Sequence, residues 1–375
     1  MNKKSAFFFI IILFLMIFSF GCSKSNNSSS EIPQSSTSPE PSESSDPLPS
    51  SEPVSSEPIG SSEPINKFIS PTTGNVFEIE HDFYPIMVTI ENASGARPQT
   101  GLNQADIIYE FPVESTITRF LCIYNDNLPK VVGPVRSARY YFLYCQKEWD
   151  CIYEHFGGAM EKFDPINVYN SKYNWIRVNI DGLLGKYSSF YWRDNSRQAP
   201  HNVYSDLTYV KVKYPDFVSS RSYFWPHSDQ PSSSEISAKK IHIPYASKKK
   251  PNVEFYFDEA TGLYTRRENG EIFKSVETNS TGNTVQEPVT TNNIIVQYVP
   301  MDTLHTTSYY RRIINMVGTG KAEFFINGKY ISGKWERKTD KDVTQYFDDQ
   351  GNEIALSVGK TWVAIQPTGY QVTFE

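Results

Sequence analysis

Residues 133–141 read Gly-Pro-Val-Arg-Ser-Ala-Arg-Tyr-Tyr and place Arg136 and Arg139 three positions apart, directly after a Gly-Pro turn. The strand-like segment before this turn contains a third arginine, Arg119. We expect a helix over Ser137–Trp149, which would hold the first two arginines at its N-terminus beside free backbone N–H groups. Such a position favours an anion.

Arginine suits an anion site because its planar fork of donors grips phosphate or carboxylate oxygens in pairs. Later segments add aromatic and polar side chains around Trp192 and at Ala199–Asn202. The candidate ligand-binding residues are therefore Asn92, Arg119, Arg136, Arg139, Arg193, His201 and Asn202. A structural alternative stays open, in which the arginines pair internally with Asp106, Glu110 and Glu114.

The sequence supplies no recognisable catalytic centre. No Gly-x-Ser-x-Gly motif indicates a serine nucleophile, and no pair of Cys or His has the spacing of a zinc site. The surroundings of His155 and His201 favour hydrogen-bonding structural roles over catalysis. We therefore assign no catalytic residue, metal or cofactor, and whether the protein is an enzyme stays open. The aromatic side chains near the arginines suit either stacking on sugar rings or core packing.

The first 21 residues have the features of an export signal. Two lysines precede an apolar run, Phe7–Phe18, which is too short for a comfortable membrane span. Gly21-Cys22 follows and matches the end of a lipobox, although Ser19 stands where that motif has leucine. We expect Cys22 to become the lipidated N-terminus of the mature protein. The alternative is an ordinary leader with an incidental cysteine.

Residues 22–66 form a predicted linker that consists almost entirely of Ser, Pro, Glu, Asn and Thr. This composition has too little apolar surface to offset the entropy of ordering, so we expect a disordered spacer that holds a folded body away from a membrane. The segment carries seven acidic residues and one lysine, and the whole chain has a net charge of −6. The folded part is therefore close to neutral, which argues against nucleic acid as a partner.

Strand and junction signals divide the rest of the chain into two domains of an α+β protein. Residues 67–235 combine apolar runs with short helical segments and predict a mixed-sheet α/β domain. Pro226–Ser237 is polar and rich in proline and serine, which suits a junction. Residues 236–375 predict a mostly antiparallel β domain, in which Asn327-Gly328 is a strong hairpin signal.

Three cysteines lie in the predicted folded part. Cys122 falls in a buried strand and is expected to be a core thiol. Cys145 and Cys151 stand six positions apart at a predicted helix, a spacing with poor geometry for a bridge. Whether these two form a disulfide stays open.

Several multi-residue motifs occur in an order that resembles the YerB-like lipoproteins of Gram-positive bacteria. They are Ile90–Asn92, Ala96–Leu102, Ile117–Phe120, Gly133–Arg139, Ala199–Asn202, Gly333–Trp335 and Gly359–Trp362. The resemblance covers about residues 70–370 and implies a two-domain exported lipoprotein. We expect the protein to be anchored through Cys22 on the outer face of the cytoplasmic membrane. The resemblance implies no particular chemistry.

A more limited likeness concerns the LytR-CpsA-Psr wall ligases, which attach glycopolymers to peptidoglycan from a polyprenyl pyrophosphate carrier. In that family arginines hold the pyrophosphate and acidic residues hold a magnesium ion. Here Ala138 and Arg139 stand where that family has an aspartate, and no acid adjoins Arg119. The sequence therefore supports the arginine part of such a site and not its metal part.

The leading hypothesis is a binding module that recognises an anionic envelope ligand, either a glycan or a lipid-linked phosphate, through an arginine-rich cleft. The second hypothesis is a phosphotransferase that resembles the wall ligases and acts on a polyprenyl-pyrophosphate-linked glycopolymer. The third is a scaffold whose β domain binds another protein.

Overall fold

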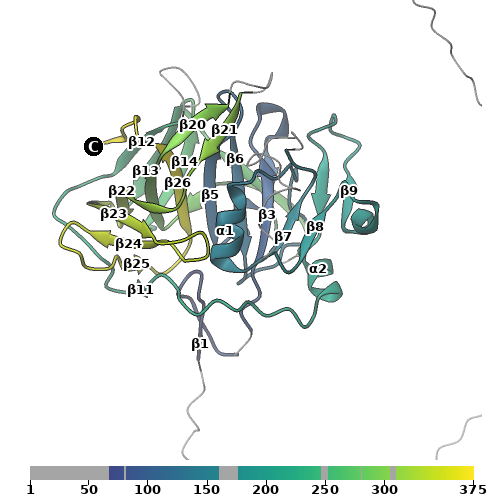
Figure 1. Ribbon diagram of the computed structural model, residues 1–375, viewed down its shortest axis with the longest axis horizontal. Helices are drawn as coiled ribbons and strands as arrows, with labels where there is room; N and C mark the ends of the chain where they lie inside the picture. Colours follow the sequence, from purple (N-terminus) through teal and green to yellow (C-terminus); the bar gives the residue numbers. More distant parts are fainter. Residues whose placement is uncertain (1–66, 80–81, 160–175, 246–251, 280, 305–309) are drawn as a thin grey trace, which may run out of the picture. The chain divides into compact units, whose positions relative to one another are not determined.

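The computed structural model describes residues 67–375 except 80–81, 160–175, 246–251, 280 and 305–309 (Figure 1). The predicted signal peptide, Cys22 and the predicted linker lie outside the described residues. The described residues belong to one compact unit. Within its described part, no helix has both the length and the apolar character needed to cross a membrane.

One mixed sheet of ten strands runs through both halves of the chain. Its central junction is a parallel pairing in which Thr361 lies opposite Ile107 and Ala364 opposite Glu110. In spatial order the strands are β24 (Gln345–Asp348), β23 (Lys329–Arg337), β22 (Gly318–Ile326), β19 (Asn293–Val299), β26 (Thr361–Pro367), β5 (Ile107–Pro112), β6 (Thr118–Tyr124), β3 (Ile86–Glu91), β7 (Ile152–His155) and β8 (Asn179–Asp181).

The sheet is antiparallel from β24 to β19 and parallel where β26 joins β19 and β5. Strands β5, β6 and β3 are antiparallel, and β7 and β8 continue in parallel. The structure therefore confirms an α+β protein with a mixed sheet in the N-terminal half and antiparallel strands in the C-terminal half. The boundary near residue 235 stays a prediction, because the shared sheet gives no separation there.

Both faces of the large sheet are covered, so its central strands are continuous apolar runs. In β6, for example, Phe120 and Cys122 enter one buried cluster, whereas Leu121 and Ile123 enter the other. Helix α1 (Phe142–Trp149) covers the second cluster (Figure 1), and helix α2 (Leu207–Lys213) contributes to the first.

A smaller sheet covers the first cluster in the C-terminal half, and its strands alternate buried and partly exposed residues as expected for one covered face. It consists of β15 (Glu271–Ile272), β14 (Leu263–Glu268), β13 (Asn252–Asp258), β12 (Lys240–Pro244) and β27 (Thr373–Phe374), with β18 (Thr290–Thr291) on β14.

Short elements connect these layers. The three-stranded sheet β17 (Thr284–Pro288), β16 (Lys274–Thr278) and β4 (Gln99–Thr100) joins the two halves a second time. The remaining strands are β1 (Phe68–Ile69), β2 (Val76–Phe77), β9 (Tyr191–Arg193), β10 (Val203–Ser205), β11 (His227–Ser228), β20 (Met301–Leu304), β21 (Arg311–Ile314) and β25 (Leu356–Ser357). The 3₁₀ helices are η1 (Ser94–Ala96), η2 (Leu102–Gln104) and η3 (Gly185–Phe190).

The predicted helix over Ser137–Trp149 was placed too early, since α1 begins at Phe142. Residues before it are extended because neighbouring segments use their backbone groups. The N–H of Arg136 donates to the Thr89 carbonyl at 2.8 Å, and the N–H of Ala138 donates to the Gly157 carbonyl at 2.9 Å. Arg136 therefore does not lie at a helix N-terminus.

The hairpin predicted at Asn327-Gly328 is confirmed between β22 and β23. Both turn residues have positive φ, 50° and 72°, as the tight turns that match strand twist require. Cys122, Cys145 and Cys151 are buried and free, so the question of a disulfide between the last two is answered for this structure.

Candidate functional site

Arg119 and Arg139 converge where β6 begins, and they share Glu114 as a carboxylate partner. Nη2 of Arg139 lies 2.5 Å from Oε1 of Glu114, and Nη2 of Arg119 lies 3.9 Å from Oε2. Both guanidinium groups also donate to the Ser137 carbonyl, at 2.8 Å from Arg119 and 3.5 Å from Arg139. A further arginine, Arg311 of β21, donates to the same Glu114 oxygen.

Arg136 lies beside this pair but uses a different carboxylate. Its Nε is 3.0 Å from Oε1 of Glu91, the last residue of β3. The other oxygen of Glu91 is 2.8 Å from Nδ1 of His201. Glu91 and Arg119 are also direct neighbours across the β3–β6 pairing. We call Arg119, Arg136 and Arg139, with Glu91 and Glu114, the arginine cluster.

Burial and mutual repulsion shape the charges of the arginine cluster. Burial, followed by the nearby charge of Arg139, lowers the pKa of Arg119 to about 9. Burial alone would raise the pKa of Glu114, but Arg139, Arg119 and Arg311 outweigh it and bring that pKa to about 2. Both groups are therefore charged at neutral pH.

Accessibility differs within the cluster. The side chains of Arg119 and Arg139 are 7% and 8% exposed, whereas Arg136 and His201 are 28% and 26% exposed. Nε of Arg119 is buried and finds no acceptor in the described part of the chain. The cluster is therefore most accessible at Arg136 and the neighbouring His201.

Asn92 lies near the cluster but is fully engaged in holding the β3–β4 connection. Its side-chain NH₂ group donates to the Thr118 hydroxyl at 2.7 Å, and its side-chain oxygen Oδ1 accepts from Arg97 and Gln99, both at 3.1 Å. Asn92 therefore positions Gln99 and the start of β6.

Arg193 ends β9 and Asn202 directly precedes β10, and neither pairs with the carboxylates of the cluster. Nη1 of Arg193 donates to Oδ1 of Asn202 at 2.8 Å, and the guanidinium stacks 5.3 Å from the Phe156 ring centre. Phe156 in turn donates its N–H to the Arg136 carbonyl. Arg193, together with Trp192, lines a separate pocket of about 470 Å³, which we call the Trp192 pocket.

The acidic residues proposed as internal partners have mixed roles. Glu114 pairs with the arginine cluster as the structural alternative predicted. Glu110 pairs instead with Arg266 at 3.0 Å, and Asp106 accepts from Thr72 and from the backbone N–H groups of Asn125 and Asp126. The sequence did not identify Glu91 as a partner, because its contacts to Arg136 and His201 span distant segments.

His155 has the structural role that the sequence favoured. Nδ1 lies 2.7 Å from the Gly157 carbonyl and Nε2 lies 2.9 Å from Oδ1 of Asn179, and the side chain is buried. Burial lowers the pKa of His155, and the nearby Asp181 and these hydrogen bonds offset part of that effect. Among the described residues, no three His, Cys, Asp or Glu side chains form a metal-binding group.

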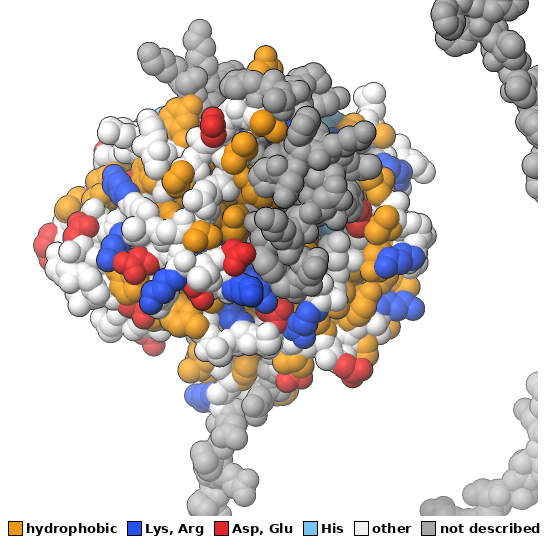
Figure 2. Space-filling model, in the orientation of Figure 1, with side chains coloured by type: hydrophobic (Ala, Val, Ile, Leu, Met, Phe, Trp, Pro, Cys, Tyr) orange, Lys and Arg blue, Asp and Glu red, His pale blue; other side chains and the backbone are white. Residues whose placement is uncertain are grey.

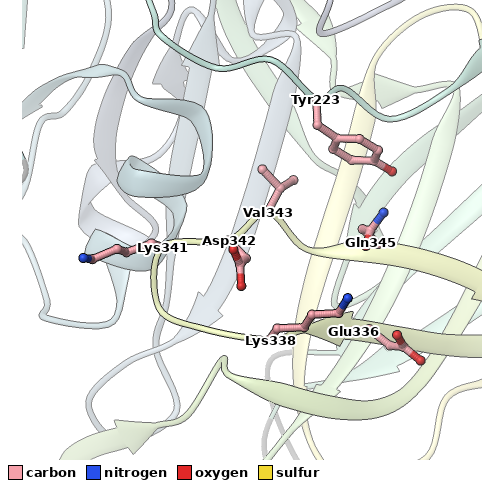
Figure 3. A pocket seen from close by; sticks show the side chains of 7 residues that line it. All are labelled: Tyr223, Glu336, Lys338, Lys341, Asp342, Val343 and Gln345. Atoms are coloured by element: carbon pink, nitrogen blue, oxygen red, sulfur yellow. The ribbon is translucent and has the colours of Figure 1, made fainter.

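A pocket of about 360 Å³ lies between Tyr223 and the β23–β24 connection. Figure 3 shows that Lys341 extends away from the other labelled side chains, which include Lys338, Asp342 and Glu336. Glu336 is already paired with Lys334 at 2.6 Å. Basic and acidic side chains are likewise interspersed on the face drawn in Figure 2, in agreement with the nearly neutral folded part.

The geometry defines a β-rich α+β protein in which one sheet joins two halves and an arginine cluster lies at the ends of β3 and β6. The chain belongs to the family described as "Protein of unknown function (DUF3048)". The model of its N-terminal domain matches residues 72–217, and the model of its C-terminal domain matches residues 241–363.

Two further comparisons agree with the YerB-like resemblance. The chain is 29% identical over 291 residues to the Bacillus subtilis (strain 168) protein named "Putative lipoprotein YerB", covering 76% of this chain and 81% of that protein. The crystal structure of YerB from Bacillus subtilis is similar with a TM-score of 0.65 and 26% identity, covering 82% of this chain and all of that one. The YerB-like family predicted from the motifs is thus confirmed.

Proposed function

We propose that this protein is a lipid-anchored extracytoplasmic binding module that holds an anionic group of an envelope ligand at the arginine cluster. The anion is a phosphate or carboxylate, carried by a glycan or by a lipid-linked phosphate. The observation that carries this proposal is the crowding of three guanidinium groups, Arg119, Arg136 and Arg139, around two carboxylates. Burial, and after it repulsion from Arg139, lowers the pKa of Arg119, and a bound anion would offset both effects.

One exposed member of the cluster and one neighbour of it define how the anion would be held. Arg136 and His201 offer the accessible donors, and Glu91 fixes both side chains in place. The buried Arg119 and Arg139 add positive potential from a medium of low dielectric constant, where charges act more strongly than in water. Pre-ordered donors keep the entropic cost of binding low.

Arg136→Ala is expected to weaken binding of an anionic ligand about tenfold, the effect of losing roughly 1.4 kcal/mol of interaction. Arg136→Lys restores the charge but not the planar fork, so only part of the affinity returns. Titration calorimetry with three probes measures this: inorganic phosphate, a purified anionic wall glycopolymer, and polyprenyl phosphate in micelles. The last two probes separate a glycan source of the anion from a lipid source.

Arg267→Ala is the matched control, since this arginine donates to the Gly270 carbonyl in the C-terminal half. The proposal fails if Arg136→Ala binds all three probes as the unmodified protein does. Magnesium-dependent turnover of a polyprenyl-pyrophosphate glycan would instead favour the phosphotransferase.

The anchor is supported by the relative whose name describes a lipoprotein, and by Gly21-Cys22 after the apolar leader. Cys22→Ala is expected to remove fatty-acid labelling and to release the protein from the membrane fraction of the producing cell. Ser23→Ala, one residue further on, is the control and should leave both unchanged. If the Cys22→Ala protein still incorporates labelled fatty acid, Cys22 is not the lipid anchor.

A further inference from the structure

The Trp192 pocket lies where the two halves of the chain meet. One wall comes from β9 and the segment between β9 and β10, with Trp192, Arg193 and Asp194. The opposite wall comes from the C-terminal β16–β17 hairpin, with Thr278 and Thr284. The parallel pairing of β16 with β4 holds the hairpin there. The pocket's volume of about 470 Å³ is within the usual range of small-molecule sites, about 300–1,000 Å³.

Trp192 is exposed to an unusual degree for this protein. Its side chain is 41% exposed, whereas Trp149, Trp225, Trp335 and Trp362 are at most 3% exposed. It pairs across the strands with Tyr204, and the two rings stack with centres 6.2 Å apart and planes 25° apart. This stack orders a large aromatic surface inside a pocket without burying it. An open aromatic ring beside ordered polar groups offers a flat apolar surface on which a ligand ring can stack.

The polar groups around Trp192 are held in place before any ligand arrives. Arg193 is fixed by Asn202 at 2.8 Å. Arg197 donates to the carbonyls of Ala96 and Pro98 at 2.9 and 2.7 Å. Oδ1 of Asp194 accepts from the N–H and the hydroxyl of Ser196, which lowers the pKa of Asp194 and keeps it ionised. Binding therefore costs these side chains little conformational entropy.

We propose that the Trp192 pocket binds an acidic saccharide. A pyranose ring has an apolar C–H face, which suits the open ring of Trp192, and a rim of paired hydroxyl groups. Asp194 can accept from these hydroxyls, and Thr278 and Thr284 can donate and accept. The exposed guanidinium of Arg193 suits the acidic substituent, because it can donate two parallel hydrogen bonds to a carboxylate or phosphate.

This inference does not depend on the arginine cluster. The Trp192 pocket includes none of Arg119, Arg136 and Arg139 among its lining residues. Binding at one site can therefore be lost while binding at the other remains. The two proposals fail independently.

The test uses the full chain in a mild detergent and measures binding of tetragalacturonate, an acidic pyranose oligomer, against neutral cellotetraose. Glucose 1-phosphate distinguishes a phosphate from a carboxylate as the acidic group. The expected result is that an acidic probe binds at least about tenfold more tightly than cellotetraose. Trp192→Ala should weaken that binding at least about tenfold, and Trp192→Phe, which retains an aromatic ring, should recover most of it.

Two variants complete the design. Thr284→Trp fills the pocket from the opposite wall and should also abolish binding, without altering Trp192. Leu184→Ala is the control, since Leu184 is 43% exposed and does not line the pocket. The inference is overturned if no acidic saccharide binds, if cellotetraose binds equally well, or if Trp192→Ala and Thr284→Trp both bind normally. In the Arg136→Ala background, the share of saccharide binding that Trp192→Ala removes should be unchanged.

Discussion

Arg266→Met is expected to lower the free energy of unfolding by about 3–5 kcal/mol, because it leaves two buried carboxylates without their shared cation. Arg266 is fully buried in β14. Its Nη2 lies 3.0 Å from Oε1 of Glu110 and 3.0 Å from Oε2 of Glu268. Burial alone would lower the pKa of Arg266, but these carboxylates outweigh it and raise that pKa. The arginine is therefore charged in the core.

The surroundings of Arg266 explain why the loss should be large. Its guanidinium lies 4.1 Å from the ring centre of Phe273 and 5.3 Å from that of Trp362, so it also makes cation–π contacts. Glu110 belongs to β5 and Arg266 to the small sheet, so the ion pair ties the two halves together. Glu268 keeps a second cationic partner, Arg97, at 2.6 Å, whereas Glu110 keeps the hydrogen bond that the Thr118 hydroxyl donates at 2.7 Å.

Urea unfolding of three variants measures the effect. Arg267→Met, at the next residue, removes an exposed hydrogen bond to the Gly270 carbonyl and a cation–π contact with Tyr256 but no ion pair with a buried carboxylate, so it should change stability by at most about 1 kcal/mol. The double variant Arg266→Met with Glu110→Gln should recover part of the loss, because it removes the stranded charge as well. An Arg266→Met protein as stable as the unmodified one would show that the network contributes nothing.

The strands could be predicted from the sequence because burial of both sheet faces makes them continuous apolar runs. The pairing of β26 with β5 could not be predicted, since it joins segments far apart in the chain and leaves no local signal. The start of α1 was missed because the hydrogen-bond acceptors that keep Arg136 and Ala138 extended lie on other strands.

The sequence indicated which residue types form the candidate site, but it did not indicate which of these residues lie together. Arginine near strand ends indicated a cationic site, and Arg119, Arg136 and Arg139 do gather. Whether an arginine belongs to the cluster or to the Trp192 pocket depends on the position in the fold of the strand that carries it. Spacing in the sequence does not reveal that position. The threonine wall of the pocket comes from the other half of the chain and was not identified.

Glu154 is a buried acid without a cationic partner in the described chain, in contrast with Glu110 and Glu114. It lies on β7 and is fully buried. Oε1 accepts from the Ser205 hydroxyl at 3.0 Å, and Oε2 has no hydrogen-bond partner among the described residues. Burial, only partly offset by Ser205, raises the pKa of Glu154 to about 8. The carboxyl group is therefore mostly protonated at neutral pH.

This raised pKa makes stability depend on pH in a defined direction. Between the ordinary pKa of 4.5 and about 8, the folded protein retains a proton that the unfolded chain has lost. Stability is therefore highest below pH 4.5 as far as this group is concerned, and falls by about 1.4 kcal/mol per pH unit as the pH rises through this window. From pH 5 to pH 8 the loss is about 3 kcal/mol.

Glu154→Gln is expected to remove this loss, because the amide cannot ionise and still offers an oxygen to Ser205. Urea unfolding from pH 5 to pH 8 measures the difference between variant and unmodified protein, which cancels the titration of other groups. The variant should gain about 3 kcal/mol relative to the unmodified protein across this range. Glu271→Gln, at an exposed site on β15, should reproduce the unmodified pH dependence. If Glu154→Gln shows the same slope as the unmodified protein, Glu154 is ionised in the folded state, and a cation or water-filled space beside Oε2 must stabilise its charge.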